Sequence, residues 1–149
     1  MLVMLARIAW IDFWTLKISN TSLLVLLLLY VAFSTSQGFV TLAPDVFSAV
    51  LLFTLGFSFW LSGKMGAGDA KLYFPLGLFI GFDGLAPFAI GLVAGTLLLL
   101  AAMKVAPSEG RLAATRRLAV LREAREVPYA LPIVLGGVFA IFFRIPYLW

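Results

Sequence analysis

The 149-residue chain contains no cysteine and no histidine. It therefore has no disulfides, no imidazole or thiolate metal ligands, and no Ser–His or Cys–His nucleophilic pair. Charged residues are scarce as well, at 12% of the chain, against roughly 25% in soluble domains. General acid–base chemistry is left to aspartate, glutamate, lysine and tyrosine. We expect no metal and no cofactor.

Apolar residues make up 63% of the chain and occur in long runs. This composition indicates an all-α integral membrane protein with no soluble domain, because a spanning helix needs about 20 mostly apolar residues. About six transmembrane helices are expected, over residues 2–16, 22–36, 43–61, 72–82, 85–103 and 127–147. The fourth is short for a span and contains Pro75, so it should be tilted, thin the bilayer locally, or be extended by the loop before it. No cleavable signal peptide is expected, because no small-residue cleavage site follows the first segment.

The positive charges are distributed very unevenly along the chain. The loops 17–21, 62–71 and 104–126 contain nine of the eleven lysines and arginines, whereas the loops 37–42 and 83–84 contain none. Positive loops face the cytoplasm, so both termini are expected outside, within a single membrane-embedded domain over residues 1–149. Residues 104–126 form a basic cytoplasmic loop, which is expected to lie on anionic headgroups or to dock a substrate or partner.

Two aspartates lie where charge is expensive. Asp12 is inside the first apolar segment, and Asp69 follows two glycines directly after the third. An ionisable group near bilayer depth indicates function by default, and the predicted topology places both carboxylates on the cytoplasmic side at similar depth. The structural alternatives are an ion pair of Asp12 with Arg7 or Lys17, and a helix cap made by Asp69.

Four features match a known family in order. Asp12 is followed by Lys-Ile-Ser-Asn at 17–20, then Gly-Ala-Gly-Asp-Ala-Lys-Leu at 66–72, then Pro-Tyr-Ala-Leu-Pro at 128–132, within a layout of six spans. The chain resembles the type IV prepilin peptidases, GxGD-type intramembrane aspartyl proteases, in the short form of tight-adherence (Flp-type) pili. Ser19 stands where that family usually has proline. The cysteine-containing amino-terminal region of the longer enzymes is missing, so no methyltransferase activity is expected.

The resemblance implies an aspartic endopeptidase whose catalytic pair, Asp12 and Asp69, shares one proton. The implied substrate is a pilin-like precursor with a basic leader, cut at the cytoplasmic face of the inner membrane. Gly66 and Gly68 are expected to let the loop approach an extended substrate. Lys71 either orients a carboxylate or a substrate carbonyl, or snorkels, and Tyr129 either lines the site or anchors the interface. The expected partners are the precursor and the bilayer, with no nucleic acid. The oligomeric state stays open.

Two other classes fit parts of the pattern. A small transporter or a pilus-assembly scaffold would use Asp12 for proton relay or packing, and helices interrupted near Pro75 and Pro87 occur in transporters. A protease of the signal-peptide-peptidase type would be larger, with nine spans. The second aspartate separates these classes, because a protease needs both carboxylates at one depth while a carrier can act with one.

Overall fold

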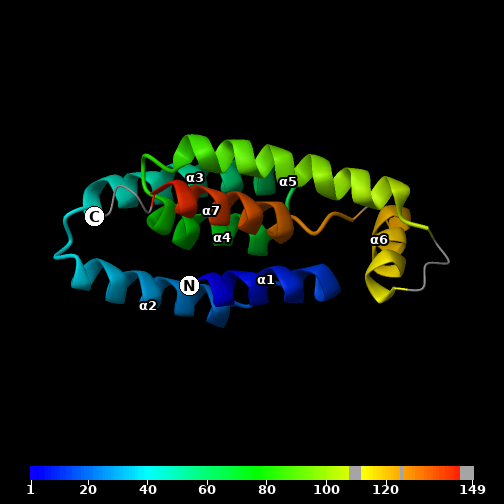
Figure 1. Cartoon of the computed structure of the whole chain (residues 1–149), viewed down its shortest axis with the longest axis horizontal. Helices are drawn as coiled ribbons and strands as arrows, with labels where there is room; N and C mark the ends of the chain where they lie inside the picture. Colours follow the sequence, from blue (N-terminus) through cyan, green and yellow to red (C-terminus); the bar gives the residue numbers. More distant parts are fainter. Residues whose placement is uncertain (108–111, 125, 145–149) are drawn as a thin grey trace.

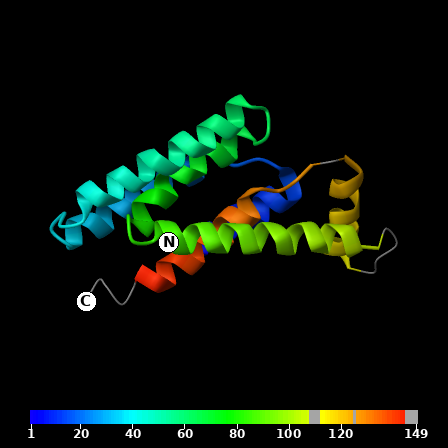
Figure 2. The ribbon, with the colours of Figure 1, turned by 90° about the horizontal axis from the view of Figure 1, so that it is seen from above.

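The computed structural model describes residues 1–107, 112–124 and 126–144. These residues form seven helices and no strand: α1 (Leu2–Thr15), α2 (Asn20–Ser36), α3 (Leu42–Leu61), α4 (Ala67–Ile80), α5 (Leu85–Val105), α6 (Ala113–Ala124) and α7 (Ala130–Arg144). Figure 1 shows the loops 37–41 and 81–84 toward the left and α6 at the right-hand end. Figure 2, turned by 90°, separates them in the same way. The two loops without positive charge thus lie away from the basic helix.

The predicted segments correspond to helices, with differences at their ends. α4 begins at Ala67, well before the predicted start at residue 72, and its first turn contains Asp69. Of the three alternatives for the short fourth segment, these bounds agree with extension by the preceding loop, whereas tilt and local thinning of the bilayer stay predictions. α7 begins at Ala130, three residues later than predicted. The predicted end at residue 147 lies outside the described residues, as do residues 108–111 and 125 of the basic loop.

The helices leave broad apolar surfaces exposed. α3 and α5 are long and apolar enough to cross a membrane, and α2 and residues Ala130–Phe143 are shorter apolar helices. Large side chains such as Val3, at 84% exposure, and Leu98, at 68%, point outward. Contiguous apolar surface of this kind marks contact with lipid or with another protein. The fold is therefore typical of a bundle whose outer face meets the bilayer.

Small residues bring the helix backbones close together. A Cβ placed on Gly77 of α4 would lie 2.5 Å from the Cα of Ala49 in α3. A Cβ on Gly136 of α7 would lie 2.9 Å from the backbone nitrogen of Leu92 in α5. Close approach at glycine is the usual way in which membrane helices associate, because lipid supplies no hydrophobic driving force between them. The α3–α4 and α5–α7 pairs are accordingly packed with their backbones close together.

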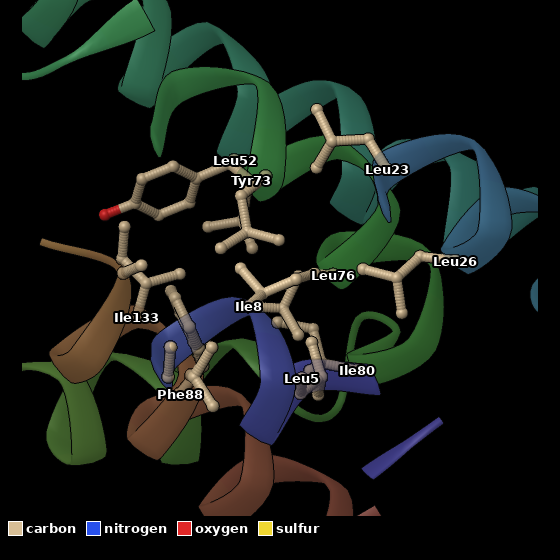
Figure 3. Close-up of a cluster of buried hydrophobic side chains, with 14 of the residues drawn as sticks. Leu5, Ile8, Leu23, Leu26, Leu52, Tyr73, Leu76, Ile80, Phe88 and Ile133 are labelled. Carbon is tan, nitrogen blue, oxygen red and sulfur yellow. The ribbon is translucent and has the colours of Figure 1, made fainter. Parts of the chain in front are cut away.

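α4 is the central helix and is apolar on most of its circumference. It contacts α2, α3, α5 and α7. Figure 3 shows Leu76 and Ile80 of α4 packed with Leu5 and Ile8 of α1 and with side chains from the other helices. A helix that is hydrophobic all round is buried by its neighbours. Its position in the core explains how a 14-residue segment, roughly 21 Å long, is stabilised.

A buried carboxylate joins α2 to α3 at their connected ends. Asp45, in the first turn of α3, is only 1% exposed. Its Oδ2 accepts hydrogen bonds from the hydroxyl of Tyr30 at 2.8 Å and from the Thr41 hydroxyl at 2.9 Å. Burial of a carboxylate is tolerated when its oxygens are hydrogen-bonded. Asp45 therefore links two helices far from the predicted catalytic pair.

The basic loop contains a helix that packs against the bundle. Leu121 of α6 is fully buried in a cluster with Phe13 of α1 and with Leu99 and Met103 of α5. The basic loop was expected to lie on anionic headgroups or to dock a substrate or partner. The structure shows that α6 also packs within the chain itself, against α1 and α5.

Candidate active site

Asp12 lies in the last turn of α1 and is 3% exposed. Its Oδ2 accepts a hydrogen bond from the backbone N–H of Ala130, the first residue of α7, at 3.3 Å. α1 ends at Thr15, and its C-cap residue, Leu16, has a left-handed conformation (φ 52°) and donates its N–H to the Asp12 carbonyl at 2.8 Å. Arg7 and Lys17 are exposed, and neither acts on the Asp12 carboxylate. The alternative of a local ion pair is therefore wrong.

Asp69 is the third residue of α4 and is 8% exposed. The N-cap is Gly66, and its backbone N–H donates to the Asp69 carboxylate. An acidic residue at the third helical position commonly reaches back to the N-cap in this way. Asp69 thus caps the helix from inside it, although it is not the N-cap residue itself.

The other carboxylate oxygen of Asp69 has unused bonding capacity. Its Oδ1 is buried and has no hydrogen-bond partner among the described residues. A buried polar atom without a partner costs free energy, about 1–3 kcal/mol and more for charged groups, so such an atom in a native protein calls for a proton, a water or a ligand. The cap therefore uses part of the hydrogen-bonding capacity of this carboxylate, and Oδ1 remains able to bind a proton, a water or a substrate.

Both aspartates line the same two clefts. The larger, of about 670 Å³, is formed by the end of α1, the residues up to Asn20, and Gly66–Asp69. The smaller, of about 350 Å³, adds Met65, Glu126 and Tyr129. The structure therefore brings together the two carboxylates that the sequence singled out, from helices far apart in the chain.

Asp69 lies in the loop-side turn of α4, before the apolar stretch that begins at Leu72. Burial, and secondarily the negative charge of Asp12, raise the pKa of Asp69 to about 7. Two carboxylates that share a poorly hydrated site cannot both ionise without a large penalty. A proton on the Asp69 carboxyl is therefore favoured below about pH 7.

The two predicted glycines shape the environment of the aspartates. A Cβ on Gly68 would lie 3.1 Å from the Cβ of Ile18, so the missing side chain lets the start of α4 approach the loop between α1 and α2. A Cβ on Gly66 would lie 3.0 Å from Oδ2 of Asp69. Both glycines line the larger cleft. Contact with an extended substrate stays a prediction, and close packing is a second reason for glycine at both positions.

Lys71 lies outside both clefts. It is exposed, and its Nζ donates to Oδ1 of Asn20 at 3.4 Å, which links the start of α4 to the start of α2. Ser19 is the N-cap of α2 and accepts a hydrogen bond from the Ser22 N–H at 3.2 Å. The serine thus starts the helix at a position where proline was expected from the resemblance.

Two tyrosines complete the surroundings of the carboxylates. Tyr129, predicted from the sequence, is half-buried and lines the smaller cleft. Tyr73, which sequence analysis missed, is buried one turn after Asp69, with Asp69 and Tyr129 as its titratable neighbours. Figure 3 shows its ring pointing out of the core cluster toward the segment that leads into α7. Tyr73 is four residues after Asp69 and therefore lies on the same face of α4. This spacing is the sequence signal from which its place near the site could have been predicted.

The described residues contain no group of three or more histidine, cysteine, aspartate or glutamate side chains that could hold a metal ion. The two buried carboxylates lie beside other titratable side chains that line the clefts, namely Lys17, Lys64, Glu126 and Tyr129. A carboxylate pair that holds one proton can both accept a proton from water and donate one.

One comparison with known proteins identifies a relationship. A family model described as the type IV leader peptidase family matches residues 1–106. This range contains both aspartates and the first five helices, whereas Tyr129, α6 and α7 lie beyond it. No curated protein and no solved structure matches the chain.

Proposed function

Because the chain belongs to the type IV leader peptidase family, we propose that it is an aspartic endopeptidase that removes the leader from type IV pilin-like precursors. One observation carries this proposal: Asp12 and Asp69 are both buried and both line the same clefts. The unpartnered Oδ1 of Asp69 adds to it. This arrangement suits a reaction in which a water and a peptide carbonyl must be held between two carboxylates.

In the proposed mechanism the two carboxylates share one proton. The ionised member takes a proton from a water, whose oxygen attacks the scissile carbonyl, while the protonated member donates its proton to the carbonyl oxygen. When the tetrahedral intermediate collapses, the carbon–nitrogen bond breaks. The leaving amine takes the proton that the first carboxylate received from water, and the second carboxylate takes back the proton from a hydroxyl of the intermediate, which restores the singly protonated pair. Asp12 and Asp69 titrate as a unit, so the two roles are assigned to the pair and not to single residues.

We further propose six spans, made by α1, α2, α3, the apolar part of α4, α5 and α7, with both termini outside. The basic loops then face the cytoplasm, together with the turn of α4 that contains Asp69. The apolar helix of a precursor would lie in lipid beside the bundle, and its positive leader would remain in the cytoplasm. An extended peptide could then reach the cleft beside Gly66 and Gly68. Lys71, bound to Asn20, is assigned a role in the shape of the loop, and Tyr129 a place beside the substrate.

The test is cleavage of a pilin-like precursor in membranes by wild type and by Asp12→Asn and Asp69→Asn. Each substitution should lower the rate by a factor of at least about 10²–10⁴, because each removes a group that transfers a proton. Asp83→Asn, at an exposed loop position, is the matched control and should cleave normally. Near-normal cleavage by either site variant, with equal membrane insertion, would refute the pair. Failure of wild type to cut any precursor would favour the transporter or scaffold alternative.

A further inference from the structure

The end of α1 is held by a side chain from far along the chain. Arg117 of α6 donates from its Nε to the carbonyl of Phe13 at 3.1 Å. Phe13 directly follows Asp12 and lies in the last turn of α1, where carbonyl groups lack partners within the helix. A guanidinium suits this position, because it satisfies an open carbonyl and faces the negative end of the helix dipole. The hydrogen bond therefore acts on the backbone next to a carboxylate of the site.

A second arginine ties the same helix to α5. Arg122 donates from Nη1 to the carbonyls of Met103, Lys104 and Ala106, at 3.4, 3.1 and 3.4 Å. α6 thus joins the carboxyl-terminal ends of two helices. Figures 1 and 2 both show it standing crosswise to α5 at one end of the molecule. Leu121, fully buried between these two contacts, supplies the apolar part of the attachment.

The chain that leaves α6 leads to the other contact of Asp12. Val127 packs against the same apolar cluster as Leu121, and Pro128 is fully buried. Two residues later, the N–H of Ala130 donates to Oδ2 of Asp12. A displacement of α6 would therefore move both the backbone next to Asp12 and the donor to its carboxylate.

From these contacts we propose that α6 is a brace for the active site and that Arg117 is a positioning residue, which holds Asp12 in place through Phe13. The proposal rests on the proposed function. It gives the basic loop a role beyond contact with headgroups, in a segment that lies outside the residues matched by the family model. Arg117 does not touch the reacting atoms. Its effect on rate comes from geometry, since a misplacement of about 1 Å can cost about 10²-fold.

Kinetics of precursor cleavage test this role with a matched set of variants. Arg117→Met removes the donor, Arg117→Gln keeps an N–H donor without the charge, and Lys104→Met removes an exposed cation near α6. We expect Arg117→Met to lower kcat about 10–100-fold with KM changed less than about twofold, Arg117→Gln to retain more activity, and Lys104→Met to match wild type. The pH–rate profile of Arg117→Met should also narrow, because the carboxylates are no longer held together.

The opposite outcomes are equally specific. Equal losses in Arg117→Met and Lys104→Met would mean that the arginine serves only as surface charge. Equal losses in the Met and Gln variants would exclude the hydrogen bond. If Arg117→Met does not insert into membranes, Arg117→Gln is compared with Lys104→Met instead. A lower kcat in Arg117→Gln alone supports the positioning role, and equal losses in the two variants refute it.

A second readout does not depend on cleavage. Because the chain has no cysteine, Ala119→Cys places a single thiol at a position of α6 that is 2% exposed, and Ala114→Cys places one at an exposed position. Arg117→Met should raise the maleimide labelling rate of the first at least about tenfold and leave the second unchanged. An unchanged rate at the first position contradicts the brace. The expected rise, combined with a wild type that cuts no precursor, supports the brace and refutes the proposed function instead.

Discussion

Gly77→Ala tests how closely α3 and α4 approach each other. The added Cβ would lie 2.5 Å from the Cα of Ala49 and 2.9 Å from its nitrogen, whereas ordinary contacts begin at 3.4 Å. The two helices must therefore separate by about 0.9 Å, the difference between 3.4 and 2.5 Å. The opposing atoms belong to the backbone, so no change of rotamer relieves the contact. α4 also contains Asp69, so the separation should reach the active site.

The free energy follows from two opposing terms. Overpacking of a well-filled interior costs about 1–3 kcal/mol, and replacing glycine by alanine inside a helix returns roughly 0.5–1 kcal/mol. Because this contact is shorter than a typical overpacked one, we expect a net loss of about 2 kcal/mol in the free energy of unfolding. The assay is thermal unfolding of the detergent-solubilised protein followed by circular dichroism, together with precursor cleavage.

Gly137→Ala is the matched control, because its added Cβ would clash with a side chain and not with the backbone. The three atoms nearest to its Cβ would all belong to the Leu76 side chain, at 2.6 Å (Cδ1), 3.0 Å (Cδ2) and 3.2 Å (Cγ). Combined with Leu76→Ala, it should cost less than the sum of the single changes, because the clash disappears. Gly77→Ala combined with Ala49→Gly should gain nothing, because the Ala49 backbone stays. Wild-type stability in Gly77→Ala, or its rescue by Ala49→Gly, would refute the close backbone contact.

Three further predictions concern other parts of the molecule. Tyr30→Phe leaves the buried Asp45 carboxylate without the donor at 2.8 Å and should lower the free energy of unfolding by about 1–3 kcal/mol; an unchanged denaturation midpoint would show that this bond contributes nothing. With the pKa of Asp69 raised to about 7 by burial and by the charge of Asp12, the pair loses its shared proton as pH rises through that value, so a pH–rate profile should fall above about pH 7, and a flat profile to pH 9 would contradict the shared proton. Gly68→Val, which places a branched side chain against the loop between α1 and α2, should lower cleavage more than Gly68→Ala does at equal expression; equal activity of the two would show that this space is not restricted.

Much of the fold and of the candidate site could be predicted from composition and pattern. Apolar runs predicted the helices, and the charge asymmetry predicted that the loops containing basic residues share one end. The absence of cysteine and histidine left carboxylates as the chemistry. Asp12 and Asp69 were chosen because charge at such positions is expensive, and they lie at one pair of clefts. These properties depend on the residues of single segments and on whether lipid or water surrounds them, so they can be predicted without knowing the tertiary structure.

Other features depended on which distant atoms meet. The sequence by itself determined that two carboxylates would be available at one end of a helical bundle. Only the tertiary structure decided that the Ala130 N–H binds Asp12, that Tyr73 faces the site, and that Arg117 reaches the Phe13 carbonyl. Helix period and hydropathy indicate which side of a helix is apolar, but they do not specify its neighbour or its depth. A hydrogen bond between residues about a hundred positions apart depends on which helices are neighbours and at which depth they meet. Its donor–acceptor distance tolerates only a few tenths of an ångström.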